Sequence, residues 1–321
     1  MKKLFLLAAT ATMMFASCSK TDVIYQDETP QEIGLFSVAK NPTKAAIEGT
    51  TFSHGNMMVA AYLSAGVGVA PGVYFTNAPF TGSGSSYTGG KYWPIQESNI
   101  NFFAVAPQVS DQVATTFTLG TGENANKGIA TVEVTNNQEN QHDIMYAVGQ
   151  GHKTTATPNP LVGMVFNHAL AMIDFKFTGN NTITINSVTV NGAMYNGTLT
   201  ITSNNWTSNT AQAATIVGWS GNTKVDNIEI PATADLTLDN TSKRYGTTGL
   251  LVRPCDATSI VINYTVTAGG DTHTYNYTFD PSEWVAGKKY TYNVSMSLSE
   301  IVINPSIVDW GTGTTEGITI N

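Results

Sequence analysis

The segment IVINYTVTAGGDTHTYNYTF, residues 260–279, decides the fold class. Apolar residues occupy every second position on both sides of a Gly-Gly-Asp turn at 269–271: Ile260, Ile262, Tyr264 and Val266 before it, and Tyr275, Tyr277 and Phe279 after it. This period-two alternation around a glycine turn predicts a β-hairpin with one apolar face.

The rest of the chain from Glu32 onward also predicts β-structure, because no window of about 11–18 residues keeps a helical apolar period. Short alternating runs separated by Gly, Asn, Pro and Thr are typical of sandwiches or barrels. A one-residue phase shift in the run 161–177 suggests a β-bulge near Ala171-Met172. Residues 203–224 predict a long loop or an insertion. Further strands are expected at 33–39, 57–63, 101–106, 129–134, 144–148 and 290–298.

The N-terminus has the pattern of a bacterial export signal. Lys2 and Lys3 precede an apolar run that ends in Ala16-Ser17-Cys18, and this run is too short to span a bilayer. A cysteine directly after two small residues resembles a lipoprotein signal, in which the cysteine is acylated and becomes the new N-terminus. The alternative is an ordinary secreted protein with an incidental cysteine.

Composition limits the partners and the chemistry. Removing residues 1–17, which hold two lysines and no acid, leaves 13 basic and 23 acidic residues and a net charge of −10. This balance disfavours nucleic acid, which needs basic patches. If Cys18 carries lipid, Cys255 has no partner, so no disulfide is expected, and Cys255 is interpreted as a small buried hydrophobe rather than a reactive thiol.

The predicted organisation has four parts. Residues 1–17 are a lipoprotein signal peptide, and 18–31 are a polar tether. Residues 151–160, rich in Pro, Thr and Gly, are the expected linker between two domains. The N-terminal β-sandwich domain then covers residues 32–152, with a first strand at 32–40, and the C-terminal β-sandwich domain covers 153–321.

Catalytic and metal-binding motifs are absent from the sequence. None of the five histidines forms a zinc motif, and neither a nucleophile elbow nor a phosphate-binding loop occurs. His168 shares a face with Met164 and Phe166, which favours a structural histidine over a ligand or base. Trp206 and Trp219 could stack on sugars, but core packing is the favoured interpretation. The chain is therefore predicted to be no enzyme and to hold no cofactor or metal.

Several runs together resemble the fimbrillin family of Bacteroidetes pilins and pilus-associated lipoproteins. Their order along residues 44–311, behind a lipoprotein signal, makes the resemblance specific. The runs are Lys91-Tyr92-Trp93-Pro94, Ile100 to Pro107, His142 to Ala147, Phe166-Asn167-His168-Ala169-Leu170, Trp284 to Tyr290 and Ile307-Val308-Asp309-Trp310-Gly311.

The resemblance implies two β-sandwich domains with transthyretin-like topology and assembly by strand exchange. In this family a protease cuts the exported lipoprotein before the core of the first domain, and the first strand leaves. The C-terminal strand of another subunit then fills the groove by β-augmentation. The partners implied are other pilin subunits, a processing protease and the outer membrane, reached through the lipid.

Carried onto this sequence, the resemblance assigns a role to each segment. The processing site matches Lys44, a lysine where the family commonly has arginine, and Lys40 is the second choice. The strand with Ile33, Leu35, Phe36 and Val38 is apolar on both parities, which predicts burial on both faces and suits a removable plug strand. The candidates for the donor strand are Ile301, Ile303, Ile307, Ile318 and Ile320.

The predicted function is a structural, accessory or tip subunit of an adhesive cell-surface pilus, first held in the outer membrane by lipid and then part of the fimbria. The alternative is a surface lipoprotein that does not polymerise, either a capped pilus anchor or a glycan-binding β-sandwich.

Overall fold

The fold is all-β, as the sequence predicts. The structure is a computed structural model, and no α-helix occurs in its described part. Accordingly, no helix in that part is long and apolar enough to cross a membrane. The described residues are 29–39, 43–44, 47–48, 55–68, 70–83, 85–108, 113–122, 125–134, 141–203, 206, 214–221, 223–230, 232, 234–255, 259–266, 270–278, 284–310 and 318–319.

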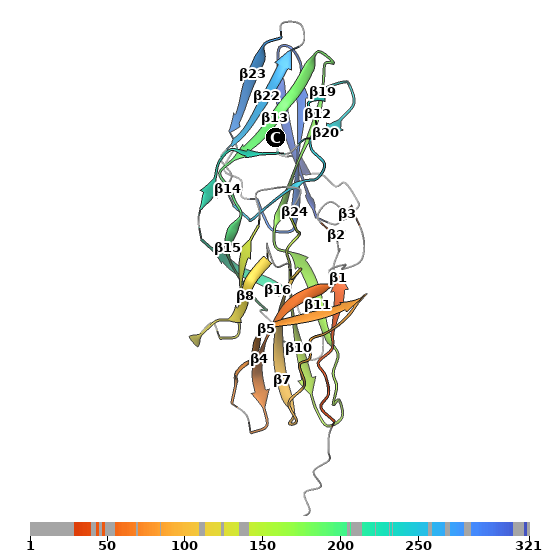
Figure 1. Ribbon diagram of the computed structural model, residues 1–321, viewed down its shortest axis with the longest axis vertical. Helices are drawn as coiled ribbons and strands as arrows, with labels where there is room; N and C mark the ends of the chain where they lie inside the picture. Colours follow the sequence, from red (N-terminus) through yellow and green to blue (C-terminus); the bar gives the residue numbers. More distant parts are fainter. Residues whose placement is uncertain are drawn as a thin grey trace, which may run out of the picture.

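A closed barrel forms one end of the elongated molecule, drawn at the lower end of Figure 1. Its interior is a separate apolar core that includes Phe80, Phe102 and Phe166, all buried. Closure removes free sheet edges from this end of the molecule. In order around the wall, its strands are β1 (Leu35–Ala39), β11 (Val162–His168), β10 (Met145–Lys153), β7 (Ser98–Ala106), β4 (Asn56–Gly66), β5 (Gly72–Ser83) and β6 (Ser86–Thr88).

A four-stranded sheet covers the outer face of the barrel and joins the two halves of the chain. Ala130 of β9 lies opposite Leu199 of β15, although 69 positions separate them. Phe103, on the outer side of β7, belongs to the same core cluster as these residues, and Trp206 packs edge-on against its ring at 5.5 Å. The strands are β16 (Ala214–Ser220), β15 (Asn196–Ser203), β9 (Gly128–Glu133) and β8 (Val113–Leu119).

Two further sheets face each other as a sandwich at the other end. The first, sheet E, contains β20 (Lys243–Arg244), β21 (Leu250–Val252), β12 (Ala171–Gly179), β24 (Lys288–Met296), β25 (Ile301–Asp309) and β26 (Ile318–Thr319). The second contains β18 (Ile228–Glu229), β19 (Leu236–Thr237), β13 (Ile183–Asn191), β22 (Ser259–Val266) and β23 (Thr272–Thr278). Two short pairs complete the fold: β2 (Thr43–Lys44) with β3 (Ile47–Glu48), and β14 (Ala193–Met194) with β17 (Lys224–Val225).

The predicted hairpin at 260–279 is confirmed as β22 and β23, with Gly270 at a positive φ of 70°. The expected bulge near Ala171-Met172 is wrong. The phase changes there because β11 ends at His168 and β12 begins at Ala171 in another sheet. The loop or insertion expected at 203–224 is also wrong in part, since β16 pairs with β15.

The predicted linker between two domains lies inside the barrel. Residues 151–160 were expected to link two domains, yet β10 and β11 on either side of the 154–161 loop both belong to the barrel and pair with each other. The division of the chain into domains therefore remains a proposal. We place it between His168 and Ala171, where the chain leaves the barrel for sheet E.

Candidate strand-exchange site

The plug strand of the sequence analysis is β1, and it is a complete member of the barrel wall (Figure 1). Leu35 lies opposite Tyr87 of the antiparallel neighbour β6 and opposite Val162 of the parallel neighbour β11. The pairing with β11 continues to Ala39 opposite Phe166. Since β1 separates β6 from β11, it is the strand that closes the barrel.

Backbone hydrogen bonds extend this pairing to the residues just before β1. Ile33 donates its N–H to the carbonyl of Lys91 at 2.7 Å, and Trp93 donates to the carbonyl of Gln31 at 2.9 Å. A carboxylate oxygen of Glu32 accepts the N–H of Gly90 at 2.9 Å. The whole stretch from Gln31 to Ala39 is thus attached to the wall.

Side chains of the plug strand divide into a deeply buried and a half-buried set. Ile33 and Leu35 are fully buried in the barrel core. Phe36, on the opposite face, is only half-buried, so the expected burial of both faces is wrong for this position. The backbone of Val38 belongs to β1, but its side chain lies outside the described residues.

Removing β1 would leave an apolar slot with two unpaired edges. Tyr87 and Val162, which flank Leu35, are themselves buried. Burial raises the pKa of the Tyr87 hydroxyl above its ordinary value, and a hydrogen bond with the side chain of Ser37 opposes that rise. An exposed slot of this kind is a template for another extended segment.

The processing candidate Lys44 lies in β2, where it is opposite Ile47 of β3. Within the described part of the chain, this short pair shares no strand ladder with the barrel or the sandwich sheets. The side chain of Lys44 is not among the described atoms, and Lys40 lies outside the described residues, as does the lipidation candidate Cys18.

The donor candidates fall into two groups. The first group, Ile301, Ile303 and Ile307, belongs to β25, which pairs with β24 along its full length. Their side chains pack against the larger core cluster, the one that also contains Phe103. Within the described residues, Ile318 belongs to β26, whose two residues pair with Ser306 and Ile307 of β25. Ile320 lies outside the described residues.

His168 is buried next to Asp143, with its Nδ1 2.7 Å from a carboxylate oxygen. This contact agrees with a structural histidine, and His142, the neighbour of Asp143, is exposed. No cluster of three or more metal-ligating side chains occurs in the described part of the chain.

Both tryptophans proposed as a sugar platform pack inward. Trp206 lies on Phe103, and Trp219 lies under the guanidinium of Arg253 at 5.5 Å. Anchoring of the covering sheet, rather than sugar stacking, is the role that these contacts favour.

Sequence reasoning missed β11 as the parallel partner of the plug strand. The signal was present, because Val162, Met164 and Phe166 alternate along the run and all three face the barrel core. Nothing in a single sequence indicates which strand pairs with which across more than a hundred residues.

The comparisons with known proteins agree with this architecture. The chain matches the model of a family described as fimbrillin-like over residues 31–310. No curated protein matches it. It is similar to the structure of a fimbrial protein from Bacteroides vulgatus, with a TM-score of 0.51 and 18% identity, covering 87% of this chain and 99% of that one. A candidate cell adhesion protein from Bacteroides ovatus gives a TM-score of 0.50 and 16% identity, covering 88% and 98%. At these identities the structural similarity bears on the fold alone.

Proposed function

The chain belongs to the fimbrillin-like family, and from this premise we propose that it is a structural or accessory subunit of a cell-surface pilus that assembles by strand exchange. Family membership supports a pilus-related or adhesion role at the cell surface, and it suggests a structural protein rather than an enzyme. In our proposal the chain is exported as a lipoprotein acylated on Cys18, is cut after Lys44, and then loses the plug strand.

The position of β1 between β6 and β11 is the observation that carries the proposal. A strand that closes a barrel can leave only by opening two edges at once, and its departure would uncover the slot that held Ile33 and Leu35. A second subunit could fill that slot with the alternating isoleucines of its C-terminal segment. Ladder hydrogen bonds would supply affinity, and the pockets for alternate side chains would supply register.

A disulfide that locks β1 to β6 tests the proposal. Ser37 donates its N–H to the carbonyl of Ser85 at 2.8 Å, so the neighbouring pair of Phe36 and Ser86 is a non-hydrogen-bonded pair. In such pairs the Cα atoms lie about 4.5 Å apart, which is within the range that a disulfide spans. The double substitution Phe36→Cys and Ser86→Cys, in a Cys255→Ser background, provides the lock.

Limited digestion with a lysine-specific protease should convert the unlocked protein into laddered oligomers. The oxidised locked variant should be cut but stay monomeric, and reduction should restore assembly. Lys40→Ala combined with Lys44→Ala, which removes both lysines between β1 and β4, should resist cleavage there and should not assemble. Oligomers from the oxidised variant would contradict the proposal, as would a cleaved wild type that loses residues 19–44 and stays monomeric.

A permanently capped anchor subunit is the second candidate. It is favoured by the lysine at position 44, where the resemblance leads one to expect arginine, and by the hydrogen bonds that hold Gln31 to Ser37 in the wall. For such a protein the wild type would keep its lipidated N-terminus on the cell surface, which mass spectrometry of the mature protein measures.

A further inference from the structure

Three loops meet at the end of the barrel farthest from the sandwich, and we call their described residues, 66–68, 70–72, 92–97 and 154–161, the barrel pole. Val67 donates its N–H to the carbonyl of Glu97 at 3.1 Å. A carboxylate oxygen of Glu97 accepts the N–H of Thr155 at 3.0 Å, and the ammonium of Lys153 donates to the carbonyl of Pro94 at 2.7 Å. These contacts join the three loops into one surface.

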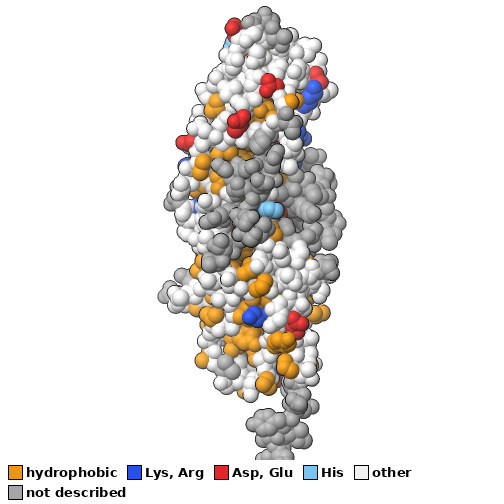
Figure 2. Space-filling view, in the orientation of Figure 1, with side chains coloured by type: hydrophobic (Ala, Val, Ile, Leu, Met, Phe, Trp, Pro, Cys, Tyr) orange, Lys and Arg blue, Asp and Glu red, His pale blue; other side chains and the backbone are white. Residues whose placement is uncertain are grey.

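Large hydrophobic side chains are exposed at or beside this pole. Exposed fractions run from 48% for Tyr92 to 80% for Ile95, with Val67, Val73 and Leu161 in between. Only four other large hydrophobic residues are comparably exposed in the described chain: Val217, Val285, Leu298 and Val302. Figure 2 shows hydrophobic side chains gathered toward the barrel end of the molecule. Single exposed residues are ordinary, but a group of them marks an interaction surface.

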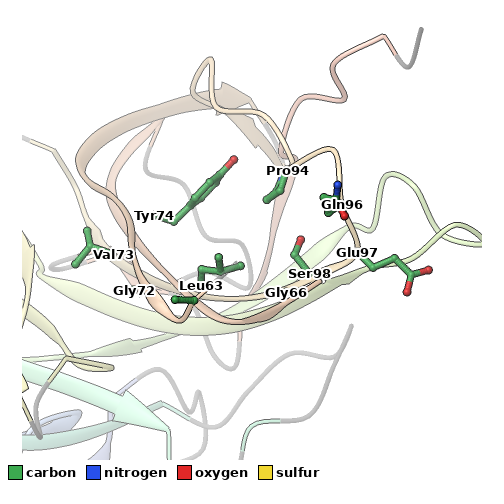
Figure 3. A pocket seen from close by; sticks show the side chains of 10 residues that line it. Leu63, Gly66, Gly72, Val73, Tyr74, Pro94, Gln96, Glu97 and Ser98 are labelled. Carbon is green, nitrogen blue, oxygen red and sulfur yellow. The ribbon is translucent and has the colours of Figure 1, made fainter. Parts of the chain in front are cut away.

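An apolar hollow lies within the same pole. Its volume is about 320 Å³, and its lining includes Leu63, Val73, Tyr74 and Pro94 (Figure 3). The hydroxyl of Tyr74 donates to the carbonyl of Tyr92 at 2.6 Å, which holds the ring in place. The hollow adds apolar surface to the pole, and Glu97 is the one charged residue in its lining.

Charge is scarce around the pole. Between Gly49 and Gln96 the sequence holds one charged residue, Lys91, and the three loops hold only Glu97. Lys153 is buried beneath the loops. Few charges next to exposed aliphatic side chains and a tyrosine suit the boundary between lipid headgroups and acyl chains, where charges are costly and tyrosine is favoured.

The first described residues of the chain also lie at this pole. Gln31 is bound to Trp93, next to Pro94 of the central loop, and the described chain starts two residues earlier at Thr29. Cys18 lies only eleven residues before Thr29, so even a fully extended tether spans no more than about 40 Å. A lipid on Cys18 would therefore hold the pole close to the bilayer and raise its effective concentration there.

We propose that the barrel pole is a membrane-contacting surface, with Val67, Val73, Tyr92 and Ile95 at the lipid interface while the chain is anchored. The inference rests on the proposed lipid anchor at Cys18. It adds that the anchored precursor lies with its barrel end against the bilayer rather than hanging freely from its tether. Because the pole carries little charge, the contact should depend weakly on salt and on anionic lipid.

An environment-sensitive fluorophore tests this orientation. Residues 19–321 carry an N-terminal histidine tag in place of the lipid and bind to phosphatidylcholine vesicles that contain a nickel-chelating lipid. In a Cys255→Ser background, Ile95→Cys carries a nitrobenzoxadiazole label. The matched control is Leu298→Cys, which is tethered in the same way and is an exposed apolar position (65%) in the β24–β25 turn at the sandwich end.

Tethering should raise the emission at position 95 at least about twofold, as expected for apolar insertion, and spin-labelled lipid should quench it. The emission at position 298 should stay constant. Val67→Ser combined with Val73→Ser should reduce the change at position 95 without altering the melting temperature. An unchanged signal at 95, or equal changes at both positions, would overturn the proposal. A rise at 95 that needs no vesicles and grows with protein concentration would also overturn it, in favour of a protein partner.

The tag holds the protein on the vesicle whether or not Cys18 is acylated in cells, and no strand exchange is needed. A negative result would therefore leave the proposed pilus function standing. Conversely, absence of acyl groups from Cys18 in the cellular protein, measured by mass spectrometry, would remove the natural anchor without affecting this measurement.

Discussion

The imidazole of His168 stacks on the indole of Trp310, with ring centroids 4.1 Å apart and ring planes 9° from parallel. His168 ends β11 in the barrel, and Trp310 directly follows β25 in sheet E. Trp310 donates its N–H to the carbonyl of Gly287, and Gly287 donates to the carbonyl of Leu170, both at 2.8 Å. The stack therefore joins the barrel to the sandwich at the point where the chain passes between them.

Replacing Trp310 by alanine should destabilise this junction. The indole is almost fully buried, and truncation of a buried aromatic residue costs roughly 3–5 kcal/mol. Trp310→Phe should cost less, because it keeps an aromatic face for the imidazole. Urea unfolding followed by circular dichroism measures both variants. A Trp310→Ala protein as stable as the wild type would show that the stack is incidental.

Gly151 makes room for the indole of Trp93, a residue of the run that resembles the fimbrillin family. A Cβ atom at position 151 would overlap the indole Cη2 and would lie 2.9 Å from a methyl of Val162. Gly151→Ala should therefore lower the free energy of unfolding by about 1–3 kcal/mol through overpacking.

The matched control is Gly218→Ala, since Gly218 also lies in a strand but has no atom within 4 Å of the added Cβ. Thermal unfolding should show a loss for position 151 and little change for position 218. Equal melting temperatures of the two variants would contradict the tight fit at Trp93.

The sequence predicted strands better than it predicted their partners. Alternation along residues 260–279 depends on local geometry alone, so β22 and β23 could be recognised without knowing the rest of the fold. The phase change after His168 was equally visible. A bulge and a passage into another sheet produce the same break in alternation. The two can be told apart only when the pairing of distant strands is known, and the local sequence does not reveal that pairing.

For the candidate site as well, the sequence predicted which residues are buried but not which strands pair. Ile33 and Leu35 were identified as core residues of the plug strand from their apolar pattern, and both are buried. Closure of the barrel by β1 was not predictable, because it requires parallel pairing with β11 some 127 positions later, as between Leu35 and Val162. The exposure of pole residues such as Ile95 was not predicted, because side chains on a loop follow no periodic pattern in the sequence.

Buried tyrosines should make the protein sensitive to alkali. Burial raises the pKa of Tyr245 to about 12, with further contributions from Glu229 and Asp235, and burial alone raises that of Tyr146 to about 12. In the unfolded chain tyrosine loses its proton near pH 10. Between pH 10 and 12 the folded state thus binds more protons than the unfolded state, and stability must fall as the pH rises.

Urea unfolding at pH 9, 10.5 and 11.5 should therefore give a constant free energy below about pH 10 and a steady decline above it. Tyr245→Phe should show a shallower decline, although it also loses the hydrogen bond from the hydroxyl to the carbonyl of Asn186. Tyr92→Phe, at an exposed tyrosine, should decline as the wild type does. A decline of Tyr245→Phe as steep as the wild type's would contradict this assignment.

Weakening the plug strand should speed assembly if the strand has to leave. Leu35 is fully buried, and truncation of a buried leucine to alanine costs roughly 2–5 kcal/mol. In Leu35→Ala much of that loss falls on the contacts that keep β1 in the wall. After cleavage of the peptide bond that follows Lys44, the variant should form oligomers at least about tenfold faster than the cleaved wild type. A difference of about 1.4 kcal/mol corresponds to a factor of ten.

Leu250→Ala is the matched control, because Leu250 is equally buried but belongs to β21 in sheet E. It should lower the free energy of unfolding by a similar amount and leave the assembly rate of the cleaved protein unchanged. Assembly is followed by the laddered bands on unheated gels over time. If both variants assemble at the same rate, departure of β1 does not limit assembly. If Leu35→Ala assembles more slowly than the wild type, β1 serves as a permanent wall strand, and any polymerisation would have to use another edge.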